Sequence, residues 1–279
     1  DKQYHFFNPR AGVSYTLAER NNFYLSFAVA QKEPTRSDFT DRYKFAADDT
    51  YPSSEKLYDW ELGYQYTAPR LSLGVNLYYM KYKDQLVPTG MVNDDSNALN
   101  TNVPDSYRRG VELSASWRAT GWFTVGANAT FSQNRIENYV DALKDSPTYG
   151  KELGDMTIAY SPDVIANAFL NFHHRGFEAV FHTQHVGKQY FTNNENDALS
   201  LDAYCVTNLN LAYTFRTRSA RSVRLGLLIN NLFNAEYESN GYGYSYMDTW
   251  SGPAPVRIDE AYYFPQAPLN VLANVTVKF

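Results

Sequence analysis

The sequence predicts an all-β protein, an antiparallel transmembrane β-barrel, and three observations lead to that fold class. First, the closing stretch from Leu269 to Phe279 alternates apolar with mostly polar residues, the period of a strand with one apolar face. Second, aromatic residues make up 16% of the chain although its mean hydropathy is -0.49, and no run of about 18 apolar residues could form a membrane helix. Third, short turns and long loops alternate along the chain.

The same alternation recurs through the whole chain and predicts about eleven strands. Because each strand would have one apolar and one polar face, the apolar faces would need lipid and the polar faces water. A strand of roughly ten residues is long enough to cross a bilayer at a tilt. The expected strands cover residues 8–20, 23–31, 57–67, 71–83, 107–118, 122–134, 164–173, 177–190, 201–215, 223–231 and 269–279.

In the first half of the chain, residues 21–22 are two asparagines, which mark a tight turn between the first two strands. The third strand carries Trp60 on one side and Asp59 and Glu61 on the other. Carboxylates in the middle of so aromatic a strand would be costly in a dry core, so we expect a water-filled lumen on their side. Residues 68–70, with a central proline, turn the chain into the fourth strand.

The second half repeats the pattern around short turns at residues 119–121, 174–176 and 216–221. Long polar loops are expected between the other strand ends, at residues 32–55, 84–105, 135–161, 192–200 and 234–262. An extension of the hairpin above the membrane is an alternative for residues 85–92. Aromatic residues gather beside the short turns, as in the interfacial girdle of a membrane barrel.

The number of strands bears on whether the barrel is complete. The end of the chain lies on the side of the short turns, and counting back places the first strand's start on the side of the long loops. A complete bacterial barrel has an even number of strands. Because about eleven is half of 22, the size of the plugged transporters, we expect residues 1–279 to form the C-terminal half of a 22-stranded barrel.

Several motifs give the chain a family resemblance. Residues 230–237 read NNLFNAEY, and Tyr-Phe-Pro-Gln at residues 263–266 precedes a strand that ends in phenylalanine. Further segments agree in order, namely Glu33 to Arg36, Trp60 to Tyr64, Tyr82 to Val87, Arg109 to Leu113 and Gly187 to Tyr190. Together they resemble the C-terminal region of TonB-dependent outer-membrane receptors, over nearly the whole chain.

The resemblance implies a receptor in the outer membrane of a Gram-negative bacterium, with a barrel filled by an N-terminal plug domain. Its partners would be that plug and the other barrel segment, the TonB complex, the outer-membrane lipid and a scarce chelate that it binds outside and imports actively. The segment at residues 33–38, Glu-Pro-Thr-Arg-x-Asp, is similar to ferric-siderophore receptors. Uptake of haem, cobalamin or a glycan remains an alternative, and the absence of histidine from the loop at residues 32–55 counts against haem.

The last long loop is the best candidate for ligand contacts, because tyrosines and a tryptophan lie close to an arginine there. Aromatic rings stack on a chelate, and arginine binds its carboxylates or negative charge. The competing interpretation is that these side chains only pack the extracellular rim. With residues from neighbouring loops, the candidate ligand-binding residues are Arg36, Arg42, Tyr149, Tyr242, Tyr244, Tyr246, Trp250 and Arg257.

Other classes of function have less support in the sequence. His182 and His185 are three apart on a strand and so face opposite sides, and we expect no metal site and no resident cofactor. An outer-membrane enzyme would need a catalytic triad, yet apart from His5 every histidine lies between residues 173 and 185. A passive porin or adhesin is the third class. The net charge of -5, with scattered basic residues, argues against nucleic acid as a partner.

Overall fold

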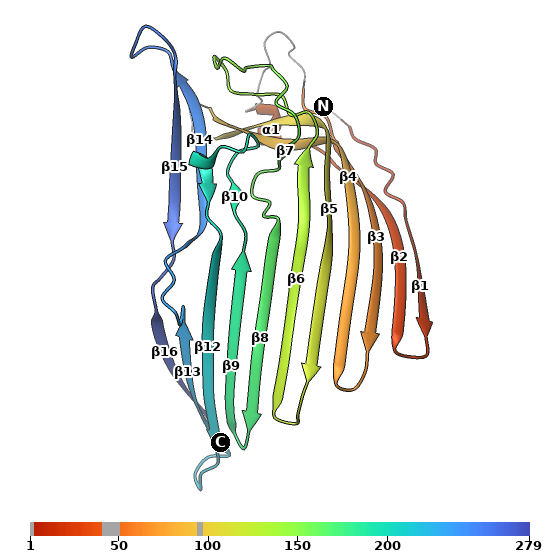
Figure 1. Ribbon diagram of the computed structural model, residues 1–279, viewed down its shortest axis with the longest axis vertical. Coiled ribbons are helices and arrows are strands. Elements are labelled where there is room, and N and C mark those ends of the chain that lie inside the picture. The colour runs from red at the N-terminus through yellow and green to blue at the C-terminus, as the bar shows by residue number, and fades with distance from the viewer. Residues whose placement is uncertain (1–2, 41–50, 94–96) are drawn as a thin grey trace.

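The computed structural model describes residues 3–40, 51–93 and 97–279. Figure 1 shows a broad antiparallel sheet of upright strands, with the start of the chain near the top and its end at the bottom. It is a 12-stranded sheet in which β7 only extends the pairing of β6. The other strands follow one another in chain order as β1 (Arg10–Leu17), β2 (Asn21–Lys32), β3 (Glu55–Thr67), β4 (Leu71–Val92), β5 (Ala98–Arg118), β6 (Phe123–Ile136), β8 (Val164–His174), β9 (Phe177–Val186), β12 (Tyr204–Phe215), β13 (Ser222–Asn230) and β16 (Asn270–Lys278).

The prediction of about eleven wall strands, joined alternately by short turns and long connections, is confirmed. The turn between β8 and β9 shows why such turns are short. Arg175 and Gly176 have φ values of 47° and 85°, the left-handed pair that matches the twist of the flanking strands. A side chain at Gly176 would also come within 2.3 Å of the Thr214 carbonyl oxygen, so glycine is required on both counts.

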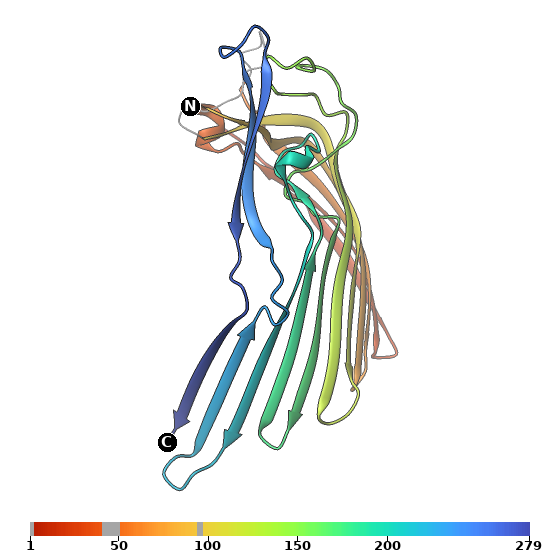
Figure 2. The same ribbon diagram turned by 60° about the vertical axis from the view of Figure 1, so that its left-hand side comes forward.

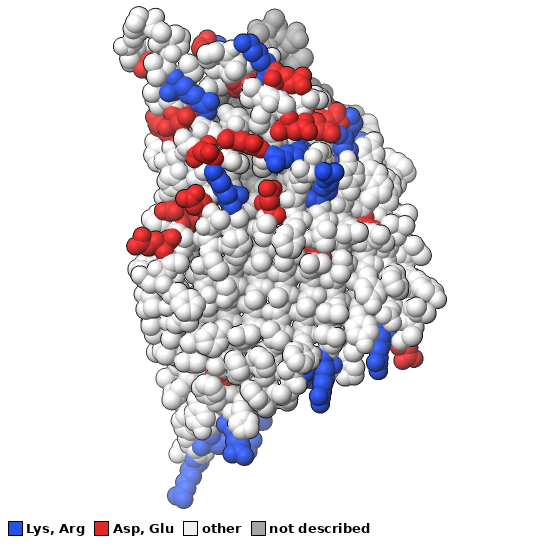
Figure 3. Space-filling view, in the orientation of Figure 1, with Lys and Arg blue, Asp and Glu red and all other residues white. Residues whose placement is uncertain are grey.

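The two faces of the sheet differ in polarity as the alternation predicts. Val75 and Leu113 are cross-strand neighbours and are 38% and 41% exposed. Figure 3 shows a broad band nearly free of charged side chains, with basic and acidic groups above it and mostly basic groups below it. On the other face, Asn76 donates to the Glu112 carboxylate over 3.2 Å. The sheet is therefore an apolar wall on one side and a polar wall on the other.

The described sheet is open. Figure 2 shows that it curves strongly, with β16 at the near edge and the first strands at the far edge. Within the residues that the structure describes, β1 pairs only with β2 and β16 only with β13. Its two outermost strands each keep one unpaired edge, and the architecture is that of a partial barrel.

The stretch 84–105 was expected mainly as a loop, but its described residues 84–92 and 98–105 continue the β4–β5 hairpin, so the alternative of an extended hairpin at residues 85–92 is confirmed. The extension bends across the top of the sheet (Figures 1 and 2), and the Asn193 amide donates to the Pro88 carbonyl oxygen over 2.6 Å. Apolar packing holds it from one side, in a cluster of Val87, Val103, Ile136, Tyr139 and Ile158. The hairpin therefore connects the middle of the wall to the segment around residues 191–201.

The remaining connections hold smaller elements. They are α1 (Arg36–Thr40), β7 (Met156–Thr157), β10 (Gln189–Tyr190), η1 (Asp197–Leu199) and β11 (Ser200–Leu201). The stretch expected as a long loop at residues 234–262 is largely a separate antiparallel hairpin of β14 (Glu238–Asp248) and β15 (Val256–Pro265), which stands above β13 and β16 (Figure 1). Of the helices that the structure describes, none is both long and apolar enough to span a membrane.

Candidate functional site

The β14–β15 hairpin carries most of the predicted ligand-binding residues, and its register decides which of them meet. Tyr242 pairs with Tyr262, Tyr244 with Glu260, and Ser245 with Asp259. Because directly paired residues share a face and alternate residues return to it, the hairpin has two distinct surfaces. We call the surface formed by Tyr242, Tyr244, Tyr246, Glu260 and Tyr262 the tyrosine face.

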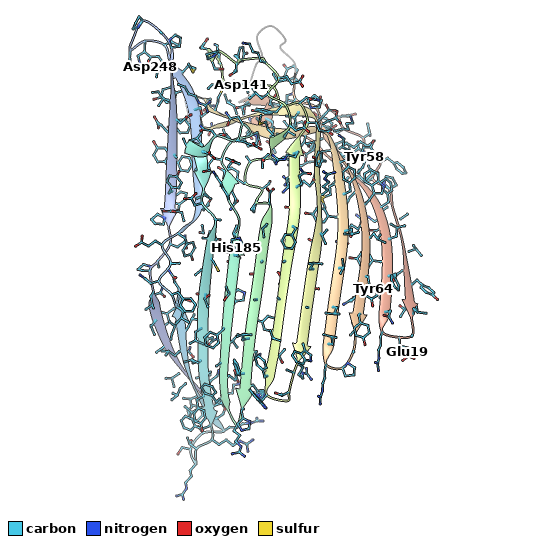
Figure 4. All side chains as sticks on the ribbon, viewed as in Figure 1. Glu19, Tyr58, Tyr64, Asp141, His185 and Asp248 are labelled. Carbon is cyan, nitrogen blue, oxygen red and sulfur yellow. The ribbon has the colours of Figure 1, made fainter. Side chains whose placement is uncertain are left out.

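The tyrosine face is organised around one carboxylate. Glu260 accepts hydrogen bonds from Tyr244 over 2.6 Å, from Tyr262 over 2.8 Å and from Tyr246 over 3.2 Å. The rings also stack on one another, since Tyr242 and Tyr262 have centroids 4.9 Å apart and planes only 14° apart. At the tip of the hairpin, Trp250 is 73% exposed and lies parallel to the Tyr246 ring at 6.4 Å. Figure 4 places Asp248, which closes β14, at the top of the molecule.

These contacts change the acidities of the groups involved. The hydroxyls of Tyr244 and Tyr262 hold the pKa of Glu260 below its usual range, because they donate to its ionised form. The same hydrogen bond raises the pKa of Tyr244. At neutral pH the face is therefore neutral phenols around one carboxylate whose oxygens already have donors. The interactions that this face can still make with a ligand are ring stacking and weak hydrogen bonds, which suit a flat, conjugated ligand.

The opposite face of the hairpin is packed against the protein. Side chains at Gly241 and Gly243 would come within 2.7 Å and 2.9 Å of the Phe191 ring, so only glycine allows this approach. Phe191 and Leu199 form a small apolar cluster there. Arg257 belongs to this face, where its Nε donates to Asp259 over 2.8 Å and its Nη2 to the Ser245 hydroxyl over 3.1 Å. Burial favours a higher pKa for Asp259, but hydrogen bonds from Ser245 and Arg257 outweigh it and lower the pKa.

The predicted residues are thus only partly brought together. The tyrosines and Trp250 share one region, whereas Arg257 lies behind them in an ion pair with Asp259. Arg36 begins α1, and Tyr149 lies in the connection between β6 and β7, both on the side of the long connections. Arg42 lies outside the described residues. All of these positions remain predictions.

A cavity of about 410 Å³ on the same side of the molecule was not anticipated from the sequence. It lies between α1, the top of β5 and residues 136–140, and Asn100, Asn102, Glu137 and Tyr139 are among its lining residues. Asp38 also borders it. Burial acts to raise the pKa of Asp38, but hydrogen bonds from Asn100 and Thr35 outweigh burial and lower it. The only signal in the sequence was the Thr-Arg-x-Asp segment, since Asn100 is 62 residues away.

The described residues offer little for a resident metal. Among them no group of three or more His, Cys, Asp or Glu side chains is placed to hold an ion. His182 pairs with Phe169 and Asn208, and His185 with Ala166 and Cys205. Their odd spacing on the regular strand β9 places them on opposite faces, as predicted.

The comparison with known proteins agrees with the fold. The family model described as TonB dependent receptor-like, beta-barrel matches residues 1–232. The chain is similar to the ferric yersiniabactin uptake receptor FyuA from Yersinia pestis, at 19% identity and a TM-score of 0.66, covering 97% of this chain and 37% of that chain.

Two further solved structures share this architecture. One is the ferric-catecholate import receptor Fiu from E. coli K12, at 19% identity and a TM-score of 0.64, covering 95% of this chain and 34% of that chain. The other is the copper transporter OprC, at 19% identity and a TM-score of 0.67, covering 97% of this chain and 39% of that chain. At such identities the likeness shows the fold alone. The chain spans less than two fifths of the length of each of these three proteins.

Proposed function

The chain belongs to the TonB dependent receptor-like β-barrel family, and we propose that it is the C-terminal half of the barrel of an outer-membrane receptor for metal chelates. In this proposal a ferric-siderophore or a similar chelate binds at the extracellular side and is imported with energy supplied through TonB. The rest of the receptor, an N-terminal plug and the first barrel strands, completes the barrel against the open edges of β1 and β16. The location is the outer membrane of a Gram-negative bacterium.

The tyrosine face is the observation that carries the choice of ligand. It lies on the side of the long connections, and two of its rings, Tyr242 and Tyr262, are 46% and 44% exposed in a stacked pair. Such a surface binds a flat, conjugated chelate with little loss of side-chain entropy, because Glu260 already holds Tyr244 and Tyr262, and Tyr242 stacks on Tyr262. Chelates with aromatic metal-binding groups fit it better than small aliphatic ones.

Other imported ligands remain candidates of the same class. Haem and cobalamin are also flat and conjugated, and a glycan can lie on tyrosine rings. Because the chain is similar to a copper transporter, a copper chelate is a further candidate ligand. A passive porin or an outer-membrane enzyme is a less favoured proposal, since the family is one of transport receptors.

Uptake and binding would test the proposal directly. Cells that lack the gene should lose accumulation of one radiolabelled chelate from a panel of ferric citrate, ferric catecholates, haem, cobalamin and copper chelates. In the purified full receptor, Tyr242→Ala with Trp250→Ala should weaken binding of that chelate about tenfold, or roughly 1.4 kcal/mol. Trp122→Ala, at the short turn before β6, is the matched control and should bind normally.

Arg257→Gln separates the two faces of the hairpin. If the tyrosine face binds the chelate, this change should have a small effect, because Arg257 lies on the other face. Unchanged affinity in the Tyr242/Trp250 variant would remove the tyrosine face as the site, and unchanged uptake of every chelate on deletion would remove the import role.

A further inference from the structure

A group of cations lies at the upper boundary of the apolar wall, on strands β3, β4 and β5. In register, Lys56 is opposite Lys83, Tyr58 is opposite Lys81, and Tyr79 is opposite Arg109. Directly paired residues share a face, and Tyr79 is also opposite Trp60, whose ring it stacks on at 5.7 Å. We call Lys56, Lys81, Lys83 and Arg109 the cationic patch.

The cationic patch belongs to the face that carries the uncharged band. Arg109 alternates with Val111 and Leu113 on β5, and Lys81 alternates with Tyr79 and Leu77 on β4. Leu77, Leu113 and Tyr79 are 44%, 41% and 40% exposed. Figure 3 shows basic side chains, interspersed with acidic ones, directly above this band. The patch therefore lies at the height where an acyl chain on the wall would end in its headgroup.

The charges of the patch are not balanced on this face. Lys81 contacts Asp105, over 3.0 Å, and Glu137, and Lys83 contacts Asp105. Within the residues that the structure describes, Lys56 and Arg109 have no carboxylate partner. Lys56 instead lies over the Tyr58 ring at 4.8 Å, and Arg109 lies over Tyr107 at 5.2 Å. Four cations with two carboxylates leave two positive charges in excess.

The geometry of Arg109 suits an oxyanion. Its Nε and Nη2 both donate to the Gln133 side-chain oxygen, over 2.9 Å and 2.5 Å, and its guanidinium lies over the Tyr107 ring, so the group is held in place. Its other edge, formed by Nη1 and the second N–H of Nη2, has no carboxylate partner among the described residues. A planar, fixed guanidinium binds phosphate oxygens through two parallel hydrogen bonds. Lys83 is half exposed and lies four residues along β4 from Tyr79, the cross-strand neighbour of Arg109, and it supplies a second, point-like charge nearer the top of the wall.

We propose that the cationic patch binds the phosphorylated headgroup of a lipid in the outer leaflet, with the acyl chains of that lipid on the apolar residues below. The inference rests on the proposed placement of this wall in an outer membrane. A lipid is favoured over a soluble anion because the patch is continuous with the uncharged band, so that Tyr79 and Val111 lie one alternation below Lys81 and Arg109. Such a lipid would stabilise the wall beneath the extended β4–β5 hairpin.

The test uses the full receptor in detergent and diphosphorylated lipid A as the probe, with bound lipid counted by native mass spectrometry. Lys56→Gln with Arg109→Gln removes the two cations that have no carboxylate partner, so no acidic group is left orphaned. We expect this variant to bind the lipid about tenfold more weakly than the native receptor. The matched control, Arg216→Gln with Arg218→Gln in the short turn after β12, should bind it normally.

Two further probes identify the ligand chemistry. Lipid A with its phosphates removed should bind at least tenfold more weakly, and millimolar inorganic phosphate should not displace the lipid. The inference is overturned if the patch variant binds the lipid as tightly as the native receptor, or if the control variant loses as much affinity as the patch variant. It is also overturned if dephosphorylated lipid A binds as tightly as the phosphorylated lipid, or if inorganic phosphate displaces the lipid.

Chelate uptake and membrane fractionation, measured on the same proteins, separate this inference from the proposed function. If the native receptor lies in the outer membrane and imports a chelate, but the patch variant binds lipid normally, only the lipid site is overturned. Recovery of the native protein outside the outer-membrane fraction would overturn both.

Discussion

Two cross-strand pairs, one in the wall and one in the upper hairpin, are almost equally exposed but present different chemistry. Val75 and Leu113 in the wall are 38% and 41% exposed, and Tyr242 and Tyr262 in the hairpin are 46% and 44% exposed. The wall pair has only aliphatic atoms to offer, as a lipid-facing surface requires. The tyrosine pair adds hydroxyls, one of which reaches a carboxylate. The exposed fraction of a side chain therefore does not distinguish a surface that faces lipid from a surface that binds a ligand.

The largest expected effect comes from placing a charge on each pair in turn. Leu113 lies midway between the rows that contain Trp117 and Arg109, so Leu113→Arg should destabilise the folded receptor in lipid vesicles by about 2–4 kcal/mol. Tyr242→Arg should change stability by no more than about 0.5 kcal/mol, because its side chain meets water. Urea unfolding in vesicles, followed by tryptophan fluorescence, measures both. Equal effects at the two positions would mean that the wall does not face lipid.

An intermediate effect is expected on the packed side of the hairpin. Gly241→Ala puts a methyl group within 2.7 Å of the Tyr262 carbonyl oxygen and the Phe191 ring, and should cost about 1–3 kcal/mol by overpacking. Hydrogen exchange should then accelerate in β14 and β15 while the wall strands stay protected. Gly252→Ala at the hairpin tip, where the nearest atom is 4.0 Å away, is the control. Normal protection of β14 in Gly241→Ala would show that the hairpin does not depend on this contact.

The same two regions show how far the sequence could predict the fold. The wall strands could be predicted because aliphatic and polar residues alternate in them, which is a local property. The hairpin was predicted as a loop, although Tyr242, Tyr244 and Tyr246 also alternate, because the residues between them are Gly and Ser, which are typical of loops. Gly241 and Gly243 are required because a side chain at either position would collide with the Phe191 ring. Phe191 is about 50 residues away in the sequence, so this contact leaves no local pattern.

The candidate site could be predicted only in part for the same reason. The sequence placed the tyrosines, Trp250 and Arg257 on one segment, but the face of Arg257 depends on the register between β14 and β15. The cavity beside Asp38 depends on Asn100, which the extended β4–β5 hairpin brings to it. A loop was the main expectation for that hairpin, so this partner could not be foreseen.

The smallest expected effect concerns the carboxylate that distinguishes the hairpin pair from the wall pair. Tyr244→Phe removes one donor to Glu260 and should move the pKa of Glu260 up toward its ordinary value. A carboxyl group whose pKa is lowered in the folded state stabilises it above the pKa of the unfolded chain, about 4.3, and loses that contribution as the pH falls through the folded pKa. Native β15 should therefore exchange its amide hydrogens more slowly than the variant at pH 7.

That difference should close only as the pH falls through the lowered pKa of Glu260 in the native protein, below which this carboxyl group is protonated in both proteins. Tyr242→Phe is the control, because the Tyr242 ring stacks on Tyr262 but its hydroxyl is not among the donors to Glu260. A difference that stays the same from pH 7 to pH 3 would mean that the Tyr244 hydroxyl acts through packing rather than through the charge of Glu260. The hairpin would then present aromatic rings and hydroxyl groups, and the charge of Glu260 would add nothing to its stability.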